Sequence, residues 1–235
     1  IDGIAVGGGL EIALPFDHFF VTASNKTKLG FPEVNLGIMP GYGGSGRAYG
    51  RVGTKVVLDM MVSGRPIGSK QAINVGLADE MVDANDDLVA AMKRWIRSCN
   101  GVKPIRTQLE SKADEIAIAD AKDKYLSRAR ADHTPAPFAI IDHVQAYSHD
   151  SEAMSASEID VFPDLMVGNV SKSLRRVYYL TDSVRKSARG DSGIEQLHVV
   201  GAGTMGGDIA AVGAMAGLNV TVTDMNKAAI DGAIT

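Results

Sequence analysis

Strand-like and helical patterns of apolar residues alternate over the first hundred residues of the chain. Residues 18–22, His-Phe-Phe-Val-Thr, are mostly aromatic or β-branched, which is typical of a strand. Helical patterns follow at residues 54–61, 69–74 and 88–96. We expect Gly64 and Gly76 to end the first two helices and Ser69 to cap the second. Such alternation favours the α/β class of folds.

Residues 101–190 carry helical patterns and little glycine. They hold 3 of the 26 glycines, and their 13 basic residues balance 13 acidic ones. Helices are expected at residues 105–130, 138–147, 155–165 and 170–189. Pro135 and Pro137 are expected to break the helical pattern, because proline lacks the backbone donor that a helix interior needs. We interpret the segment as exposed, charged helices that link two domains.

Residues 191–235 give the clearest local pattern. A strand at 194–200 leads into Gly201-Ala-Gly-Thr-Met-Gly206, which opens a helix, and a second strand at 220–223 ends beside Asp224. In this context the Gly-x-Gly-x-x-Gly run predicts the start of a doubly wound Rossmann domain that binds a dinucleotide. The expected cofactor-binding residues are Gly201, Gly203, Thr204, Met205, Gly206 and Asp224.

These residues have distinct expected roles. Gly201 permits the tight turn, Gly203 lets the backbone approach a pyrophosphate, and Gly206 lets the helix pack on the strand. Asp224 would accept hydrogen bonds from ribose hydroxyls and repel a 2′-phosphate, which predicts NAD as the cofactor. A glycine turn with a purely structural role is the alternative.

Composition excludes several classes of protein. Hydrophobic residues make up 45% and charged residues 22% of the chain, which is the balance of a globular protein. The net charge of −4 gives no support for a nucleic-acid partner, and no apolar stretch is long enough for a membrane span. A single cysteine, Cys99, indicates a reducing compartment. The histidines show no metal-ligand spacing, so we expect no metal site.

Two glutamates stand among apolar residues beside glycine-rich sequence. Glu11 follows three glycines at the start of a short apolar helix, and Glu33 precedes the glycines of residues 37–44. Glycines before a helix leave backbone N–H groups free to hold a developing oxyanion, and a carboxyl pair suits acid–base chemistry. A solvent-facing glutamate on an amphipathic helix is the alternative for Glu11. The separation of 22 positions does not by itself bring the two together.

Three blocks of the first segment resemble the crotonase (enoyl-CoA hydratase/isomerase) superfamily. They are residues 2–17, residues 29–44, and the pair 63–72 and 76–81. The resemblance implies that Gly8 supplies an N–H group to a thioester oxyanion and that Glu11 and Glu33 are catalytic. The presence of both glutamates favours hydration of a double bond. Pro15-Phe16 departs from the family's small residues, which puts substrate preference in question.

Residues 199–226 resemble the start of 3-hydroxyacyl-CoA dehydrogenases, with Asp208 in place of the family's usual glycine. We therefore expect an α/β chain of three parts. Residues 1–100 form a crotonase-type ββα spiral that lacks its N-terminal part, residues 101–190 a helical linker, and residues 191–235 a truncated NAD-binding domain. This order resembles that of multifunctional enzymes of fatty-acid β-oxidation. It places the catalytic histidine and glutamate of the dehydrogenase beyond Asp224.

The resemblance implies hydration of trans-2-enoyl-CoA, followed by NAD-dependent oxidation of the 3-hydroxyacyl-CoA product. Glu33 would give the proton to Cα and Glu11 would activate water. The alternatives are a double-bond isomerase, which needs one glutamate, and a non-catalytic scaffold that docks a thiolase subunit. The 235 residues alone are expected to be inactive. The expected partners are an acyl-CoA substrate and a thiolase β-subunit, in the cytoplasm of a bacterium or in a eukaryotic mitochondrion or peroxisome.

Overall fold

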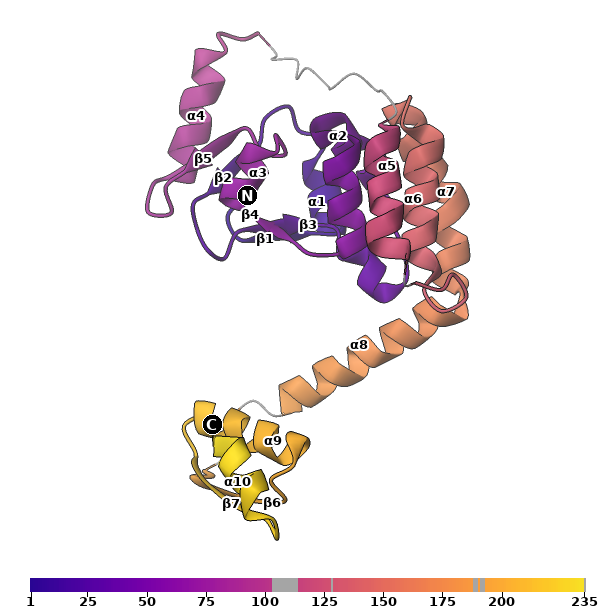
Figure 1. Ribbon diagram of the computed structural model, residues 1–235. Helices are drawn as coiled ribbons and strands as arrows, with labels where there is room; N and C mark the ends of the chain where they lie inside the picture. The colour runs from indigo at the N-terminus through magenta and orange to yellow at the C-terminus, as the bar shows by residue number, and fades with distance from the viewer. Residues whose placement is uncertain (103–113, 128, 188–189, 191–192, 235) are drawn as a thin grey trace. The chain divides into compact units, whose positions relative to one another are not determined.

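The computed structural model describes residues 1–102, 114–127, 129–187, 190 and 193–234, and contacts divide it into two compact units. The first unit is Ile1–Leu180 and the second is Thr181–Thr235 (Figure 1). Within the described residues, no helix combines the length and the apolar character that crossing a membrane requires.

The first unit contains two small sheets. One sheet has three strands in the order β1 (Ile4–Val6), β3 (Lys28–Gly30) and β4 (Ile67–Gly68). β1 and β3 are parallel, with Ile4 opposite Lys28, and β4 is antiparallel to β3. The other sheet pairs β2 (Phe20–Thr22) with β5 (Glu80–Val82) in parallel. β2 confirms the strand predicted at residues 18–22. The other strands of this unit were not predicted, because segments of two or three residues are too short to show an alternating pattern.

The helices of the first hundred residues surround these sheets. They are α1 (Gly8–Ala13), the 3₁₀ helix η1 (Glu33–Leu36), α2 (Gly44–Ser63), α3 (Ser69–Asn74) and α4 (Leu88–Ser98). α2 kinks at Gly53, and only its second half was predicted. Gly64 ends α2 in the left-handed conformation, as expected. The predicted capping role of Ser69 is wrong: Gly68 is the N-cap, and the Ser69 hydroxyl donates instead to the Thr22 carbonyl at 2.5 Å.

Residues after 100 add further helices to the same unit. They are α5 (Glu115–Ala121), the π-helical turn η2 (Lys122–Leu126), α6 (Pro135–Tyr147), α7 (Ser151–Val167) and α8 (Asn169–Ser187), the last running across the division at residue 180. The helical pattern is interrupted as predicted, since residues 129–134 form no helix, but Pro135 and Pro137 themselves lie in the first turn of α6, where no backbone donor is needed. Part of the helix predicted at 105–130 lies outside the described residues.

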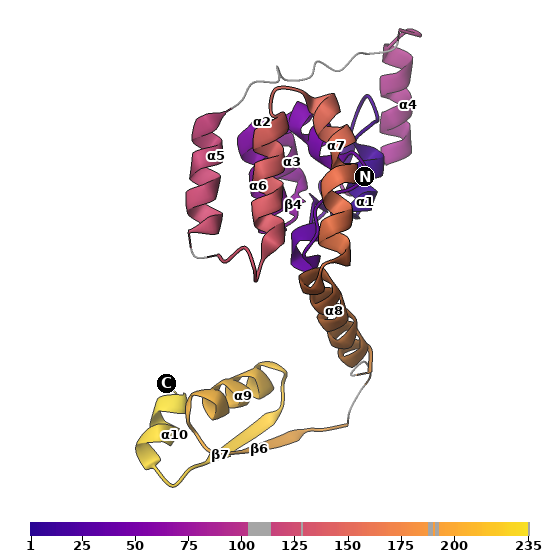
Figure 2. The same cartoon turned by 90° about the vertical axis from the view of Figure 1, so that its right-hand side faces the viewer.

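Helices α5, α6 and α7 pack along α2 (Figures 1 and 2). Their buried apolar side chains share one core with α2 and with the sheet residues. That core includes Leu58, Ile118, Ile140, Ile141 and Met154. The helices expected to form an exposed linker therefore bury an apolar face. As a result, residues on both sides of the boundary predicted at residue 100 share one hydrophobic core.

The second unit shows the predicted order of strand, glycine turn, helix and strand. It consists of β6 (Gln196–Val200), α9 (Thr204–Met215), β7 (Asn219–Thr223) and α10 (Lys227–Ile234). β6 and β7 are parallel, with Gln196 opposite Asn219, and α9 connects them. This is one βαβ unit of the kind that begins a Rossmann domain.

Candidate active site

Glu11 is buried on α1, and its carboxylate is held by backbone. The side chain is 4% exposed. Its Oε1 accepts hydrogen bonds from the N–H groups of Tyr42 at 2.8 Å and Gly44 at 3.0 Å. Both donors belong to a glycine-rich stretch, Tyr42–Ser45, which we name the amide loop. The partner that a buried carboxylate needs is therefore backbone, not a basic side chain.

The amide loop runs into the N-terminus of α2, where Gly43 is the N-cap. The first N–H groups of a helix have no acceptor within it, and the helix dipole favours negative charge there. Gly44 is required at this point, because a Cβ atom would lie 2.7 Å from Glu11 Oε1. The glycines that the sequence shows at 41–46 thus let a carboxylate come close to backbone.

Glu33 lies at the N-terminus of α1, beside Gly7. It begins η1, and its Oε1 lies 2.7 Å from where a Cβ atom on Gly7 would be. Gly7 has φ of +55° and is the N-cap of α1. The structure therefore brings Glu33 to the N-terminus of the helix that carries Glu11, which their spacing in the sequence could not establish.

The Glu33 carboxyl group is held far less firmly than that of Glu11. Its Oε2 is buried and has no hydrogen-bond partner within the described part of the chain. Burial, together with the charges of Glu11 and Glu158, raises the pKa of Glu33 from 4.5 to about 7, although a bond from its own backbone N–H partly offsets the rise. A carboxyl group with that pKa can both give and take a proton at neutral pH.

Gly8 is the first residue of α1. Its N–H therefore belongs to the set that a helix leaves without an internal acceptor. A Cβ atom on Gly8 would lie 4.0 Å from Glu11 Oε2, so the residue lies beside one of the two carboxyl groups. The three residues expected to be catalytic, Gly8, Glu11 and Glu33, thus gather around the start of one short helix.

A third buried carboxylate, Glu158, reaches this region from α7. It accepts hydrogen bonds from the N–H groups of Gly43 at 2.5 Å and Ser45 at 2.7 Å. Sequence reasoning missed it, since it lies in the segment interpreted as an exposed linker. A signal was present: Met154 and Leu165 share its helical face at the spacing of a buried stripe.

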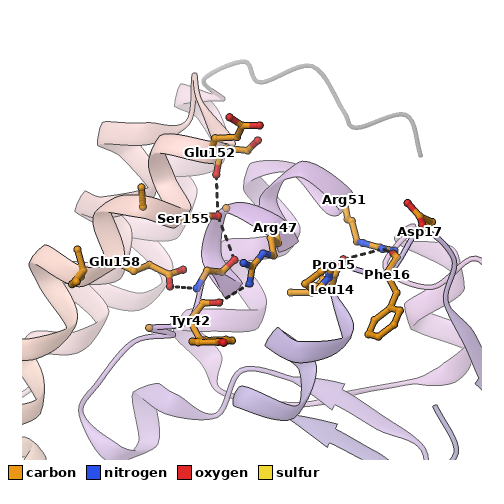
Figure 3. Close-up of a pocket in the computed structure, with 16 residues that line it drawn as sticks. Leu14, Pro15, Phe16, Asp17, Tyr42, Arg47, Arg51, Glu152, Ser155 and Glu158 are labelled. Atoms are coloured by element: carbon orange, nitrogen blue, oxygen red, sulfur yellow. Dashed lines mark hydrogen bonds between the residues drawn. The ribbon is translucent and has the colours of Figure 1, made fainter. Parts of the chain in front are cut away.

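A cavity of about 1040 Å³ opens beside the amide loop (Figure 3). The residues that follow α1, part of the amide loop, the first half of α2 and α7 line it, and Glu158 points from α7 toward the loop. Arg51 fixes one wall by donating to the carbonyl groups of Leu14 at 3.1 Å and Phe16 at 2.5 Å. Pro15 and Phe16, the pair that departs from the family pattern, lie on the same wall.

The glycine turn of the second unit has the geometry that its sequence suggested. Gly201 has φ of +100°, and its N–H donates to the Thr223 carbonyl at 2.7 Å. A Cβ atom on Gly206 would lie 1.8 Å from the Gly201 carbonyl oxygen, so only glycine fits there. Gly203 is the N-cap of α9 and faces open space. The backbone is therefore open to a phosphate group at this helix N-terminus.

Asp224 lies at the end of β7 and braces the same turn. Its Oδ2 accepts a hydrogen bond from the N–H of Ala202 at 2.7 Å, and its Oδ1 accepts one from Asn226 at 2.7 Å. These backbone donors lower the pKa of Asp224. Thr204 and Met205 begin α9 and are exposed, as is Asp208 in its second turn. Among the described residues, no group of three acidic, histidine or cysteine side chains is placed to hold a metal ion.

The structure is that of an α/β protein in which buried carboxyl groups lie at helix N-termini. Residues 1–134 match the family described as enoyl-CoA hydratase/isomerase. Because this match spans more than half of the chain, the chain belongs to that family. Residues 196–235 match the NAD-binding domain of 3-hydroxyacyl-CoA dehydrogenase, which confirms the predicted NAD-binding character of the C-terminal segment.

Curated relatives match the whole chain. Fatty acid oxidation complex subunit alpha of Shewanella loihica is 33% identical over 249 aligned residues, and that of Shewanella putrefaciens is 31% identical over 246. Each alignment covers 100% of this chain and 35% of the relative, so the chain spans about a third of the length of these proteins.

Solved structures share the fold. An enoyl-CoA hydratase/isomerase from Pseudoalteromonas atlantica has a TM-score of 0.51 at 16% identity, covering 76% of this chain and 59% of that one. An enoyl-CoA hydratase from Mycobacterium avium subsp. paratuberculosis has a TM-score of 0.52 at 18% identity, covering 76% and 61%. The predicted fold class, crotonase-type α/β with the start of a Rossmann domain, is confirmed.

Proposed function

We propose that the protein hydrates trans-2-enoyl-CoA to 3-hydroxyacyl-CoA at the site formed by Gly8, Glu11 and Glu33. The observation that carries the proposal is the convergence of two carboxyl groups on the N-terminus of α1. Glu11 Oε2 would lie 4.0 Å from a Cβ atom on Gly8, and Glu33 Oε1 would lie 2.7 Å from one on Gly7. Membership of the enoyl-CoA hydratase/isomerase family supports a CoA thioester as the substrate.

The two carboxyl groups divide the work of adding water. Glu11 takes a proton from water, whose hydroxyl oxygen then bonds to Cβ of the substrate. Glu33 gives its proton to Cα, and the electron pair of the double bond forms the new C–H bond by way of an enolate. The Gly8 N–H donates to the enolate oxygen and stabilises it. The pKa of about 7 for Glu33 supports its role as donor, because a substantial fraction is protonated at neutral pH.

The assay for this proposal separates it from its alternatives. The native protein, purified from its source, is given a trans-2-enoyl-CoA and, separately, a 3-enoyl-CoA. We expect the trans-2 substrate to gain water and yield 3-hydroxyacyl-CoA. Conversion of the 3-enoyl substrate without addition of water would favour an isomerase. No turnover of either substrate would favour the non-catalytic scaffold and overturn the proposal.

For the second unit we propose NAD-dependent oxidation of the hydration product by the native protein. The fit of a dinucleotide is supported by the open N-terminus of α9 at Gly203 and by the close packing at Gly206. Each oxygen of Asp224 accepts one backbone hydrogen bond and keeps a lone pair for a ribose hydroxyl. Bound NAD supplies the hydride acceptor. Titration of the native protein with NAD and NADP, followed by quenching of protein fluorescence, tests the site without turnover.

The partner and the compartment are also proposals. The curated relatives are named as subunits of a complex, which supports a thiolase subunit that consumes the 3-ketoacyl-CoA product. These relatives are bacterial, which favours the cytoplasm over an organelle. The thiolase partner is tested by assaying thiolase activity in the fractions that contain the native protein during purification. We expect the activity to elute with the protein.

A further inference from the structure

The four N–H groups of the amide loop, Tyr42–Ser45, alternate between two carboxylates. The first and third donate to Glu11, at 2.8 and 3.0 Å. The second and fourth donate to Glu158, at 2.5 and 2.7 Å. One stretch of backbone is therefore bonded to two acids. The peptide planes bonded to Glu11 alternate with those bonded to Glu158, so a shift of one acid turns planes that adjoin those bonded to the other.

Glu158 is tied into a buried polar network beyond the loop. It is 1% exposed, and the Ser45 hydroxyl donates to its Oε1 at 2.5 Å. The Ser45 Oγ also lies 3.2 Å from Nε2 of His143 on α6. Burial lowers the pKa of His143, which favours a neutral ring. The single Ser45 proton goes to Glu158, so the direction of the Ser45–His143 contact depends on which ring nitrogen carries a proton.

These three residue types also form the triads of nucleophilic enzymes, but the arrangement here does not suit that chemistry. Ser45 is 0% exposed, so its oxygen cannot meet a substrate. Its proton faces the carboxylate and not the imidazole, whereas a nucleophile needs the imidazole as base. The network instead fixes the orientation of the backbone between Glu11 and α2.

We propose that Glu158 is a positioning residue for the hydration, which holds the second and fourth N–H groups of the amide loop so that the first and third face Glu11. The proposal rests on the proposed function of Glu11. Loss of Glu158 frees two peptide planes to rotate, and Glu11 Oε1 loses its fixed place. A displacement of about 1 Å at a catalytic group lowers rate on the order of 100-fold.

The Glu158 charge has a second effect that gives the proposal its own signature. It is one of the charges that raise the pKa of Glu33. The charged or titratable groups around Glu158 are Glu11 on α1, Glu33 on η1, Arg47 on α2 and His143 on α6. Removing its charge should therefore lower the pKa of Glu33 while the other groups stay in place.

The test compares Glu158→Gln with Asp160→Asn in the native protein. Asp160 lies two residues further along α7 and is exposed, so its change removes the same charge without touching the loop. For Glu158→Gln we expect kcat for hydration to fall about 10-fold or more with KM changed less than about threefold, the pattern of a lost transition-state interaction. The limb of the pH profile that reports Glu33 should move to lower pH. Asp160→Asn should leave kcat and the profile unchanged.

Ser45→Ala is the second variant, for the case that Glu158→Gln does not fold. It keeps all four N–H groups and removes one bond to Glu158, so kcat should fall about two- to fivefold, the worth of roughly one hydrogen bond. Unchanged kcat in whichever variant folds, or an equal loss in Asp160→Asn, would overturn the positioning role alone. Absence of hydration by the unaltered native protein would overturn the proposed function instead.

Discussion

Glu11 and Glu33 are held in unlike ways, and this difference supports the roles proposed for them. Two backbone N–H groups donate to Glu11 Oε1 and fix its position beside the N-terminus of α2. Glu33 has one buried oxygen without a donor in the described structure, and burial raises its pKa to about 7. A carboxyl group that is partly protonated at neutral pH suits the role of proton donor proposed for Glu33.

Replacing either glutamate by glutamine should therefore remove hydration. We expect Glu11→Gln and Glu33→Gln each to lower kcat by about 100-fold or more, the usual worth of general acid–base catalysis. The control is Glu115→Gln, since Glu115 is exposed at the start of α5. Steady-state hydration of a trans-2-enoyl-CoA by the native protein and its variants gives the measurement. Near-full turnover in either variant would refute the carboxyl pair.

The raised pKa of Glu33 also predicts how stability depends on pH. Between pH 4.5 and about 7 the folded protein holds a proton that the unfolded chain has released, so the free energy of unfolding falls as pH rises through this range. A shift of that size corresponds to about 3 kcal/mol at most. Glu33→Gln removes the titration, so its unfolding temperature should exceed that of the unaltered protein at pH 8 and match it near pH 4. Parallel melting curves across that range would contradict this.

At the level of elements, Arg51 joins the end of α1 to the start of β5. It is 8% exposed and donates to the carbonyl groups of Leu14, Phe16 and Leu77. Its guanidinium lies 3.5 Å from Asp79 Oδ2. One buried cation thus binds carbonyl groups of two segments that are distant in sequence, and it lines one wall of the cavity.

Loss of this cation should destabilise the first unit. For Arg51→Met we expect roughly 3 kcal/mol or more of lost stability, because the carbonyl groups and Asp79 would be left without the charge. Arg51→Lys should recover part of it, since lysine keeps the charge but cannot reach several acceptors at once. Thermal unfolding of both variants gives the comparison. A Tm for Arg51→Met within a degree of the unaltered protein would disprove this role.

Local patterns predicted some elements and could not predict others. The strand–turn–helix–strand of residues 194–224 was predicted because each signal lies within a few residues of the next. The first half of α2 was missed, because glycines at 44, 46 and 50 weaken a helical pattern although their N–H groups serve the site. Pro135 was interpreted as a break because the same residue type both starts and interrupts helices.

The sequence could propose residues for the candidate site but not their arrangement. Glu11 and Glu33 came from motifs, whereas the partner of Glu11 is backbone, which has no signature in sequence. Glu158 accepts a hydrogen bond from the N–H of Gly43, which lies 115 positions away in the sequence. Such a contact depends on tertiary packing of α7 against α2, and a pattern read along the chain does not contain it.

For the whole molecule, the two proposed activities should respond separately to mutation. Asp224 lies in the second unit, and the carboxyl groups of the hydration site lie in the first. Asp224→Ala should reduce the preference for NAD over NADP and leave kcat for hydration unchanged. Parallel titrations with the two dinucleotides and a hydration assay on one preparation measure both. Equal affinity for NAD and NADP in the unaltered protein would refute the role of Asp224.

The alternation of the amide loop restricts how this sequence can recombine with its relatives. The loop and α7 are inherited from distant stretches of one gene, yet Glu158 fits only a loop whose second and fourth N–H groups face it. Gly46 adds a steric condition, since a Cβ there would lie 2.0 Å from the Ser151 carbonyl oxygen. Crossovers between residues 46 and 151 therefore separate parts that must match, and gene shuffling should recover functional chimeras mainly from crossovers outside that interval.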